Sequence, residues 1–121
     1  MANNTIVMVE DDEMIAEIYK KQMEKSGFRV IIVDDSTKAA EEIKKTEPDL
    51  VLMDLLMPGG GGLEILKQLK GWPGKTKKII FSNEQESEKV LEARNLGADG
   101  FWIKASFTPS QLIKEVEKML A

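Results

Sequence analysis

Acidic, hydroxyl and lysine side chains stand directly after short apolar runs in this sequence. Glu10 and Asp11 follow the first run, and Asp54 follows a later one. Ser82 and Lys104 follow two further runs. Carboxylate oxygens are the ligands that Mg²⁺ and Ca²⁺ prefer, and a carboxylate can also act as a nucleophile toward a phosphoryl group. If the fold brings these residues together, the chemistry they support is cation binding and phosphoryl transfer.

The composition excludes several other kinds of site. The chain has 121 residues, no cysteine, no histidine and a net charge of −4. Disulfides, thiolate or imidazole metal sites and Ser-His-Asp catalysis are therefore excluded, and the negative charge disfavours a nucleic-acid surface. No segment reaches the roughly 18 apolar residues of a membrane span, and no signal-peptide pattern opens the sequence. We expect one cytoplasmic domain that contacts neither nucleic acid nor membrane.

Apolar runs alternate with amphipathic stretches along the whole sequence, which predicts strand and helix in turn. The predicted strands cover residues 5–9, 29–33, 50–53, 78–81 and 100–103. Near-continuous apolar strands that alternate with helices are typical of a parallel sheet covered on both faces. Right-handed crossovers then favour an α/β, doubly wound, flavodoxin-like (βα)5 domain with the strand order 2-1-3-4-5.

Helix ends are marked by turn and cap residues. Gly27 is expected to close the first helix, and Ser36 to cap the second, which Pro48 stops. Residues 108–111 have the pattern of a capping box with proline at the first helical position.

Ligands of doubly wound sheets bind beyond the carboxyl ends of the strands, where the strand order reverses. Five polar residues are predicted at the carboxyl ends of the strands: Glu10, Asp11, Asp54, Ser82 and Lys104. Taken alone, the first two fit a solvated helix cap as well as a cation site. Asp34 and Asp35 also follow an apolar run. That run is the second strand, which the predicted order makes an outer strand of the sheet, away from Asp54, so we interpret the two acids as a turn and a helix cap. The convergence of separate strand ends is what favours a site.

The sequence resembles the receiver domain of two-component response regulators over nearly all of its length. Four motifs carry the resemblance: VEDD at 9–12, LMDLLMPGGGGLEIL at 52–66, IIFSN at 79–83 and GADGFWIK at 97–104. It implies a phosphoacceptor domain that uses Mg²⁺ as its cofactor. The physical chemistry agrees, because the cation offsets repulsion among the carboxylates and neutralises charge on the phosphoryl group.

The resemblance also implies a role for each residue of the metal site. Glu10 and Asp11 would be the acidic pair that holds Mg²⁺. Asp54 and the backbone carbonyl of Leu56 would be further ligands.

A second set of roles concerns the phosphoryl group. Asp54 would accept it, and Ser82 and Lys104 would contact it afterwards. Phe101 stands where the family has an aromatic that changes rotamer on phosphorylation, although a plain strand aromatic explains it equally well. Trp102, which should point away from Phe101, is a candidate for partner contact.

The function implied is that of a stand-alone receiver, residues 1–121, with no output domain in this chain. A sensor histidine kinase or a phosphotransfer protein would donate the phosphoryl group. The output would be a changed affinity for a downstream protein at the face formed by the fourth helix, the fifth strand and the fifth helix. We expect a monomer or weak dimer, and no enzymatic turnover beyond self-phosphorylation and self-dephosphorylation.

Three departures from the family pattern affect switching. Lys104 is followed by Ala105 where the family usually has a cis proline, and a non-proline cis bond costs roughly 2.5–4 kcal/mol, so the loop is either trans or strained. Asn83 stands where a small residue is usual and would crowd phosphate access. The glycine run at 59–62 predicts a mobile loop.

Two other functions stay open. The residues Asn83 and Ala105 favour a receiver-like interaction module that works without phosphorylation. A phosphohydrolase with Asp54 as its nucleophile is the second alternative. Phosphatases of the haloacid-dehalogenase type have a second aspartate two residues later, where this chain has Leu56.

Overall fold

The computed structural model of the chain describes residues 4–84 and 87–121. Within these residues, five strands form one parallel sheet in the order β2-β1-β3-β4-β5. The strands are β1 (Thr5–Val9), β2 (Arg29–Val33), β3 (Leu50–Met53), β4 (Lys77–Ser82) and β5 (Gly100–Ile103). The predicted α/β architecture and strand order are therefore confirmed. Only β4 differs from its predicted range, by one residue at each end.

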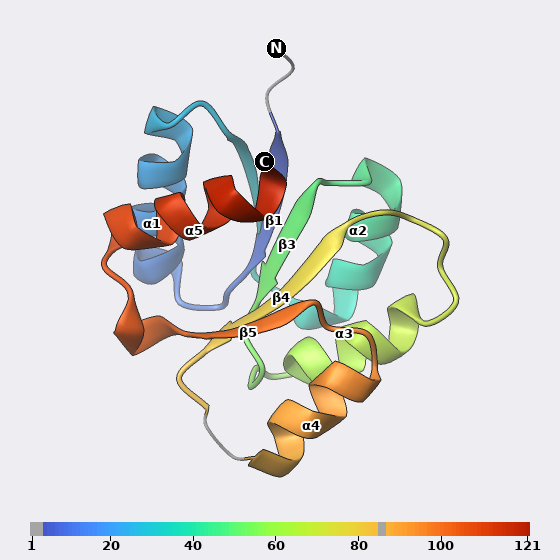
Figure 1. Cartoon of the computed structure of the whole chain (residues 1–121). Coiled ribbons are helices and arrows are strands. Elements are labelled where there is room, and N and C mark those ends of the chain that lie inside the picture. Colours follow the sequence, from blue (N-terminus) through green and yellow to red (C-terminus); the bar gives the residue numbers. More distant parts are fainter. Residues whose placement is uncertain (1–3, 85–86) are drawn as a thin grey trace.

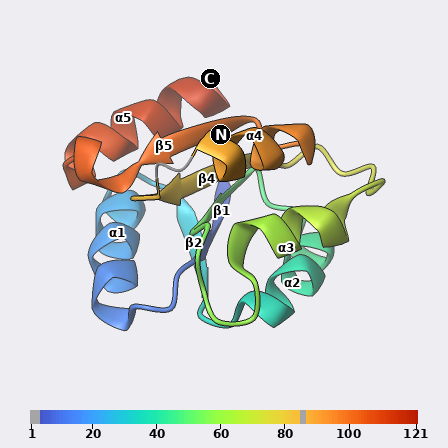
Figure 2. The same cartoon turned by 90° about the horizontal axis from the view of Figure 1, so that it is seen from below.

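Helices cover both faces of this sheet. They are α1 (Glu13–Lys25), α2 (Ala39–Thr46), α3 (Gly61–Leu69), α4 (Ser87–Asn95) and α5 (Pro109–Leu120), with 3₁₀ turns η1 (Ser36–Lys38) and η2 (Lys104–Ser106). Figures 1 and 2 show α1 and α5 on one face and α2 and α3 on the other. The longest described helix, α1, has 13 residues, and none of the described helices has the length and apolar character that a membrane crossing requires.

Strand side chains alternate between two apolar cores, one on each face of the sheet. Val51 and Met53 of β3 pack on the side of α2 and α3, whereas Leu50 and Leu52 pack on the side of α1 and α5. All four residues are buried. Burial on both faces explains why the strands are continuous apolar runs in the sequence.

Two of the predicted helix ends are confirmed, and the start of the second helix is corrected. Thr108 and Gln111 form the complete capping box, and Gly27 follows α1 with a positive φ. Ser36 does not cap a helix. The cap is Asp35, as its assignment with Asp34 to a turn and a helix cap predicted: its carboxylate accepts a hydrogen bond from the amide of Thr37 at 2.9 Å, in the 3₁₀ turn that precedes α2.

The buried Ser36 instead anchors the glycine-rich loop between β3 and α3. Its hydroxyl donates a hydrogen bond to the carbonyl oxygen of Pro58 at 2.7 Å and accepts one from the amide of Gly61 at 3.4 Å. Gly61 has a φ of +60°, and a Cβ atom there would lie 2.2 Å from the carbonyl oxygen of Leu55. The loop is thus fixed at two points to the segment that follows β2.

We expect the Gly61→Ala substitution to lower the free energy of unfolding by about 3 kcal/mol or more, since steric overlap with Leu55 adds to the left-handed backbone penalty. Gly71 is a matched control, because its φ is +81° but a Cβ atom there would meet nothing within 4 Å. Gly71→Ala should cost only about 1 kcal/mol. Urea unfolding followed by circular dichroism measures both values, and equal losses would contradict this account of the loop.

Candidate functional site

The strand register brings the predicted site residues to one edge of the sheet. Val9 of β1 pairs with Met53 of β3, and Ser82 of β4 pairs with Ile103 of β5. The amide of Asp54 donates to the carbonyl of Val9 at 3.2 Å, which continues the ladder one residue past β3. The residues that follow these strands therefore emerge side by side.

The carboxylate of Asp54 is held at both of its oxygens. Oδ2 lies 2.8 Å from the ammonium nitrogen of Lys104. Oδ1 accepts hydrogen bonds from the hydroxyl of Ser82 at 3.0 Å and from the amide of Leu56 at 3.2 Å. The side chain of Asp54 keeps 16% of its surface exposed, so it is oriented by its neighbours and still accessible from solvent.

Lys104 lies between two carboxylates. Its ammonium group contacts the Oε1 atom of the buried Glu10 as well as Asp54, and it lies 5.9 Å from the centre of the Phe81 ring. Burial opposes the charged form, but the hydrogen bonds and negative charges of Asp54 and Glu10 outweigh it and hold the pKa of Lys104 above its usual value. One ammonium group thus offsets the repulsion between these two acids.

The first three acids after β1 have three different surroundings. Glu10 points inward, and its Oε2 atom accepts a hydrogen bond from the amide of Asp12 at 3.2 Å. The Asp12 carboxylate caps α1 by accepting from the amide of Ile15. Asp11 is exposed and lies at an open hollow of about 520 Å³, whose other lining residues are Asp34, Asp35, Thr37, Pro58 and Gly59.

The donor groups fit a hard cation such as Mg²⁺, since they are carboxylate and backbone carbonyl oxygens. Glu10 and Asp54 both accept hydrogen bonds from the ammonium group of Lys104, whereas Asp11 lies at the neighbouring hollow. Among the residues that the structure describes, no three acidic side chains are gathered closely enough to hold a metal ion. Metal ligation by Glu10, Asp11, Asp54 and the Leu56 carbonyl stays a prediction.

Asn83 and Ala105 form a contact that sequence reasoning missed. The Oδ1 atom of Asn83 accepts a hydrogen bond from the amide of Ala105 at 2.8 Å, and the peptide bond between Lys104 and Ala105 is trans. The sequence did carry a signal, because these two residues are the departures from the family pattern that directly follow Ser82 and Lys104.

The two aromatic residues of β5 pack on opposite faces of the sheet, as strand alternation predicts. Phe101 packs on the side of α2 and α3 and lines a small hollow of about 110 Å³ with residues of α4. Trp102 packs on the other side, with its ring centre 5.9 Å from that of Phe107. Both are partly buried. A rotamer change of Phe101 and a partner contact of Trp102 stay predictions.

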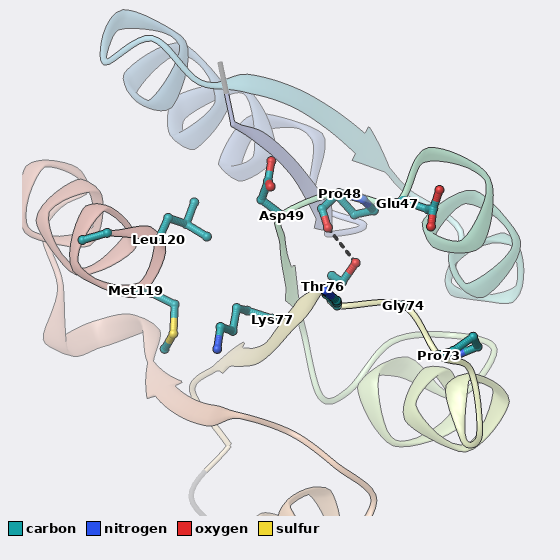
Figure 3. Close-up of a pocket in the computed structure, with 11 residues that line it drawn as sticks. Glu47, Pro48, Asp49, Pro73, Gly74, Thr76, Lys77, Met119 and Leu120 are labelled. Atoms are coloured by element: carbon teal, nitrogen blue, oxygen red, sulfur yellow. Dashed lines mark hydrogen bonds between the residues drawn. The ribbon is translucent and has the colours of Figure 1, made fainter. Parts of the chain in front are cut away.

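Another hollow, of about 580 Å³, lies at the amino ends of the strands and is separate from this site (Figure 3). It is lined by residues that precede or begin β3 and β4 and by the end of α5. The buried Thr76 donates a hydrogen bond to the carbonyl of Pro48 there at 2.6 Å. Asp54 follows the far end of β3, so this hollow does not open onto its carboxylate.

Tyr19 and Lys104 together predict how stability changes at alkaline pH. Burial raises the pKa of Tyr19, the single tyrosine of the chain; the positive charge of Lys104 opposes this rise, and the negative charge of Glu10 adds to it. The pKa of Lys104 is also raised. A raised folded-state pKa contributes stability that is complete below the unfolded-state pKa and is lost as the pH rises through the folded value.

The unfolded-state pKa values of tyrosine and lysine lie at about 10. We therefore expect the contribution of these two groups to the free energy of unfolding to be constant up to about pH 10 and to fall above it. Urea unfolding at several alkaline pH values, together with the phenolate absorbance of Tyr19, measures this. The Lys104→Met variant, which lacks one of the two groups, should lose less stability over the same range. An equal or larger loss in that variant would contradict the assignment.

The fold and site define a class: a flavodoxin-like α/β domain whose acidic site, at the carboxyl edge of a parallel sheet, holds an aspartate between a lysine and a serine. The chain belongs to the response regulator receiver domain family, whose model matches residues 6–117. It is 31% identical to the alkaline phosphatase synthesis transcriptional regulatory protein PhoP of Bacillus subtilis, over 98% of this chain and 49% of the relative. The chain spans about half the length of the curated relatives it matches.

Solved receiver structures have the same fold. A response regulator receiver domain protein (CheY-like) from Methanospirillum hungatei is 28% identical, with a TM-score of 0.89 over 98% of this chain and 94% of that one. A two-component response regulator of the LuxR family from Aurantimonas is 32% identical, with a TM-score of 0.85 over 98% of this chain and 86% of that one. As a receiver, this chain is a phosphoacceptor signalling domain of the two-component type.

Proposed function

We propose that this receiver accepts a phosphoryl group on Asp54 and that the modification changes its affinity for a protein partner. The observation that carries the proposal is the Asp54 carboxylate, held by Lys104 at one oxygen and by Ser82 at the other. A nucleophile that is already oriented is what phosphoryl transfer requires, because positioning and charge stabilisation supply most of the catalysis.

In the proposed reaction, a bond forms between a carboxylate oxygen of Asp54 and phosphorus. The bond between phosphorus and the donor nitrogen of a phosphohistidine breaks, and the donor leaves with the bonding electron pair. The Lys104 ammonium and the Ser82 hydroxyl then offset charge on the phosphoryl oxygens. Glu10, Asp11, Asp54 and the Leu56 carbonyl are the residues that would hold Mg²⁺, which supplies further charge neutralisation when bound.

The proposed output is a population shift at the face formed by α4, β5 and α5. New phosphoryl contacts would draw Ser82 and Lys104 inward, and these residues begin the loops that lead to α4 and α5. Leu91 of α4 is 55% exposed and offers apolar surface to a partner that contacts this helix. We propose a cytoplasmic monomer or weak dimer, phosphorylated by a sensor histidine kinase or a phosphotransfer protein. The stand-alone arrangement stays a prediction.

Incubation with a small acyl phosphate tests the proposal. The intact mass should rise by one phosphoryl group in the presence of Mg²⁺ and stay unchanged after the ion is removed with a chelator. No mass gain under either condition would instead support a receiver that binds its partner without phosphorylation.

The phosphohydrolase alternative has less support. The residue two places after Asp54 is Leu56, whose side chain is 52% exposed and whose amide donates to Asp54. No acid there can protonate a leaving group. Steady turnover of a generic phosphoester by the wild type, absent in Asp54→Asn, would revive this alternative.

A further inference from the structure

The hydrogen bond between Asn83 and Ala105 joins two loops that lead into the proposed phosphorylation site. Ser82 ends β4 opposite Ile103 of β5, so Asn83 and Lys104 are the first residues beyond that pair. The 2.8 Å bond from the Ala105 amide to Asn83 Oδ1 therefore continues the β4–β5 connection past the last backbone pair.

This bond closes a ring of contacts around Asp54. One side runs from Asp54 Oδ1 to the Ser82 hydroxyl and along the chain to Asn83. The other side runs from Asp54 Oδ2 to the Lys104 ammonium and along the chain to Ala105. Beyond the last backbone pair, Ser82 with Ile103, the bond between Asn83 and Ala105 is what joins the two sides at their far ends.

The same bond explains two unusual residues at once. Proline has no amide hydrogen, so a proline at position 105 could not donate to Asn83. A small residue at position 83 could not accept. Ala105 lies in the first turn of η2, where the amide groups of a helical turn need an external acceptor. Ile103, the residue before η2, supplies none from its side chain. Asn83 supplies the missing acceptor from the neighbouring loop.

We propose that Asn83 is a positioning residue that ties the backbone after Lys104 to the backbone after Ser82, so that both side chains approach Asp54 as one unit. This inference rests on the proposed phosphorylation of Asp54. It assigns to Asn83 a contribution to the rate of the reaction. Asn83 also lines the hollow of about 260 Å³ between α1 and the loop after β5, together with Lys104 and Ala105, so its side chain is turned toward that loop.

Amide hydrogen exchange of Ala105, measured by NMR on the whole chain, tests the bond directly. In Asn83→Ala we expect this amide to exchange roughly three- to tenfold faster than in the wild type, the effect of losing one hydrogen bond. Asn83→Asp keeps the acceptor oxygen and should restore the protection. Asn95→Ala, a change of the same type at the exposed end of α4, should leave the Ala105 amide unchanged.

Phosphorylation kinetics test the positioning role. In Asn83→Ala the maximal rate with a small acyl phosphate should fall roughly three- to tenfold, with little change in the donor concentration that gives half of it. The inference would be overturned if the Ala105 amide exchanges equally fast in both proteins. It would also be overturned if the wild type is phosphorylated and Asn83→Ala has the same maximal rate. If the proposed function fails instead, the wild type gains no phosphoryl mass, and the Ala105 amide still exchanges faster in Asn83→Ala than in the wild type.

Discussion

Replacing Lys104 with methionine should lower the free energy of unfolding at neutral pH by about 2–4 kcal/mol. Glu10 is 4% exposed, and its carboxylate would face that of Asp54 with no ammonium group between them. Removing one partner of a buried charge pair is costly because the other charge stays desolvated. The partial exposure of Lys104 and Asp54 places the expected value at the lower end of what fully buried pairs cost.

The same substitution should slow phosphorylation by a small donor by about a hundredfold, the effect of losing one preorganised charge at the reacting group. Lys118→Met is the matched control, because Lys118 is exposed and forms a surface pair with Glu115 at the long distance of 3.9 Å. That control should change stability by less than about 0.5 kcal/mol. If Lys104→Met were as stable as the wild type, Lys104 would not be the residue that offsets the negative charges of Glu10 and Asp54.

Asp54→Asn should abolish phosphorylation, with incorporation at least about a hundredfold below the wild type, because an amide oxygen is a poor nucleophile compared with a carboxylate. The fold should persist, since the amide oxygen of asparagine can accept the same hydrogen bonds from Ser82 and Leu56, and Lys104 keeps its contact with Glu10. Intact mass after incubation with donor and Mg²⁺ measures the loss.

Asp34→Asn is the matched control for that variant. Asp34 follows β2, a parallel strand whose carboxyl end lies at the same edge of the sheet, yet it has no role in the proposed reaction. Its phosphorylation should equal that of the wild type. Incorporation that survives in Asp54→Asn but disappears in Asp34→Asn would move the acceptor to the loop after β2.

The sequence predicted the sheet well because its central strands, β1 and β3, are buried on both faces. β3 has four apolar residues in a row, and the polar residue that ends this run, Asp54, marks where the strand leaves the core. Crossover handedness favoured the doubly wound architecture, and the order 2-1-3-4-5 is that of a small five-stranded member of this class. The convergence of Asp54, Ser82 and Lys104 then followed from the fold, without any knowledge of individual contacts.

The contacts that the sequence did not predict join residues far apart in the chain. Glu10 was assigned to metal binding, and its contact with Lys104, 94 residues away, was not foreseen. Ser36 was expected to cap a helix, but its partner is the carbonyl of Pro58, 22 residues later. Such contacts depend on how loops pack against one another, and no periodicity in the sequence encodes them.

The most direct test of the central claim is to find where the phosphoryl group is attached. Protein phosphorylated with a small donor and Mg²⁺ can be treated with borohydride, which reduces an aspartyl phosphate to a stable product, and then digested and sequenced by mass spectrometry. The account predicts one modified position, Asp54. Modification at Asp11, Asp34 or Asp35 instead, with Asp54 untouched, would contradict it.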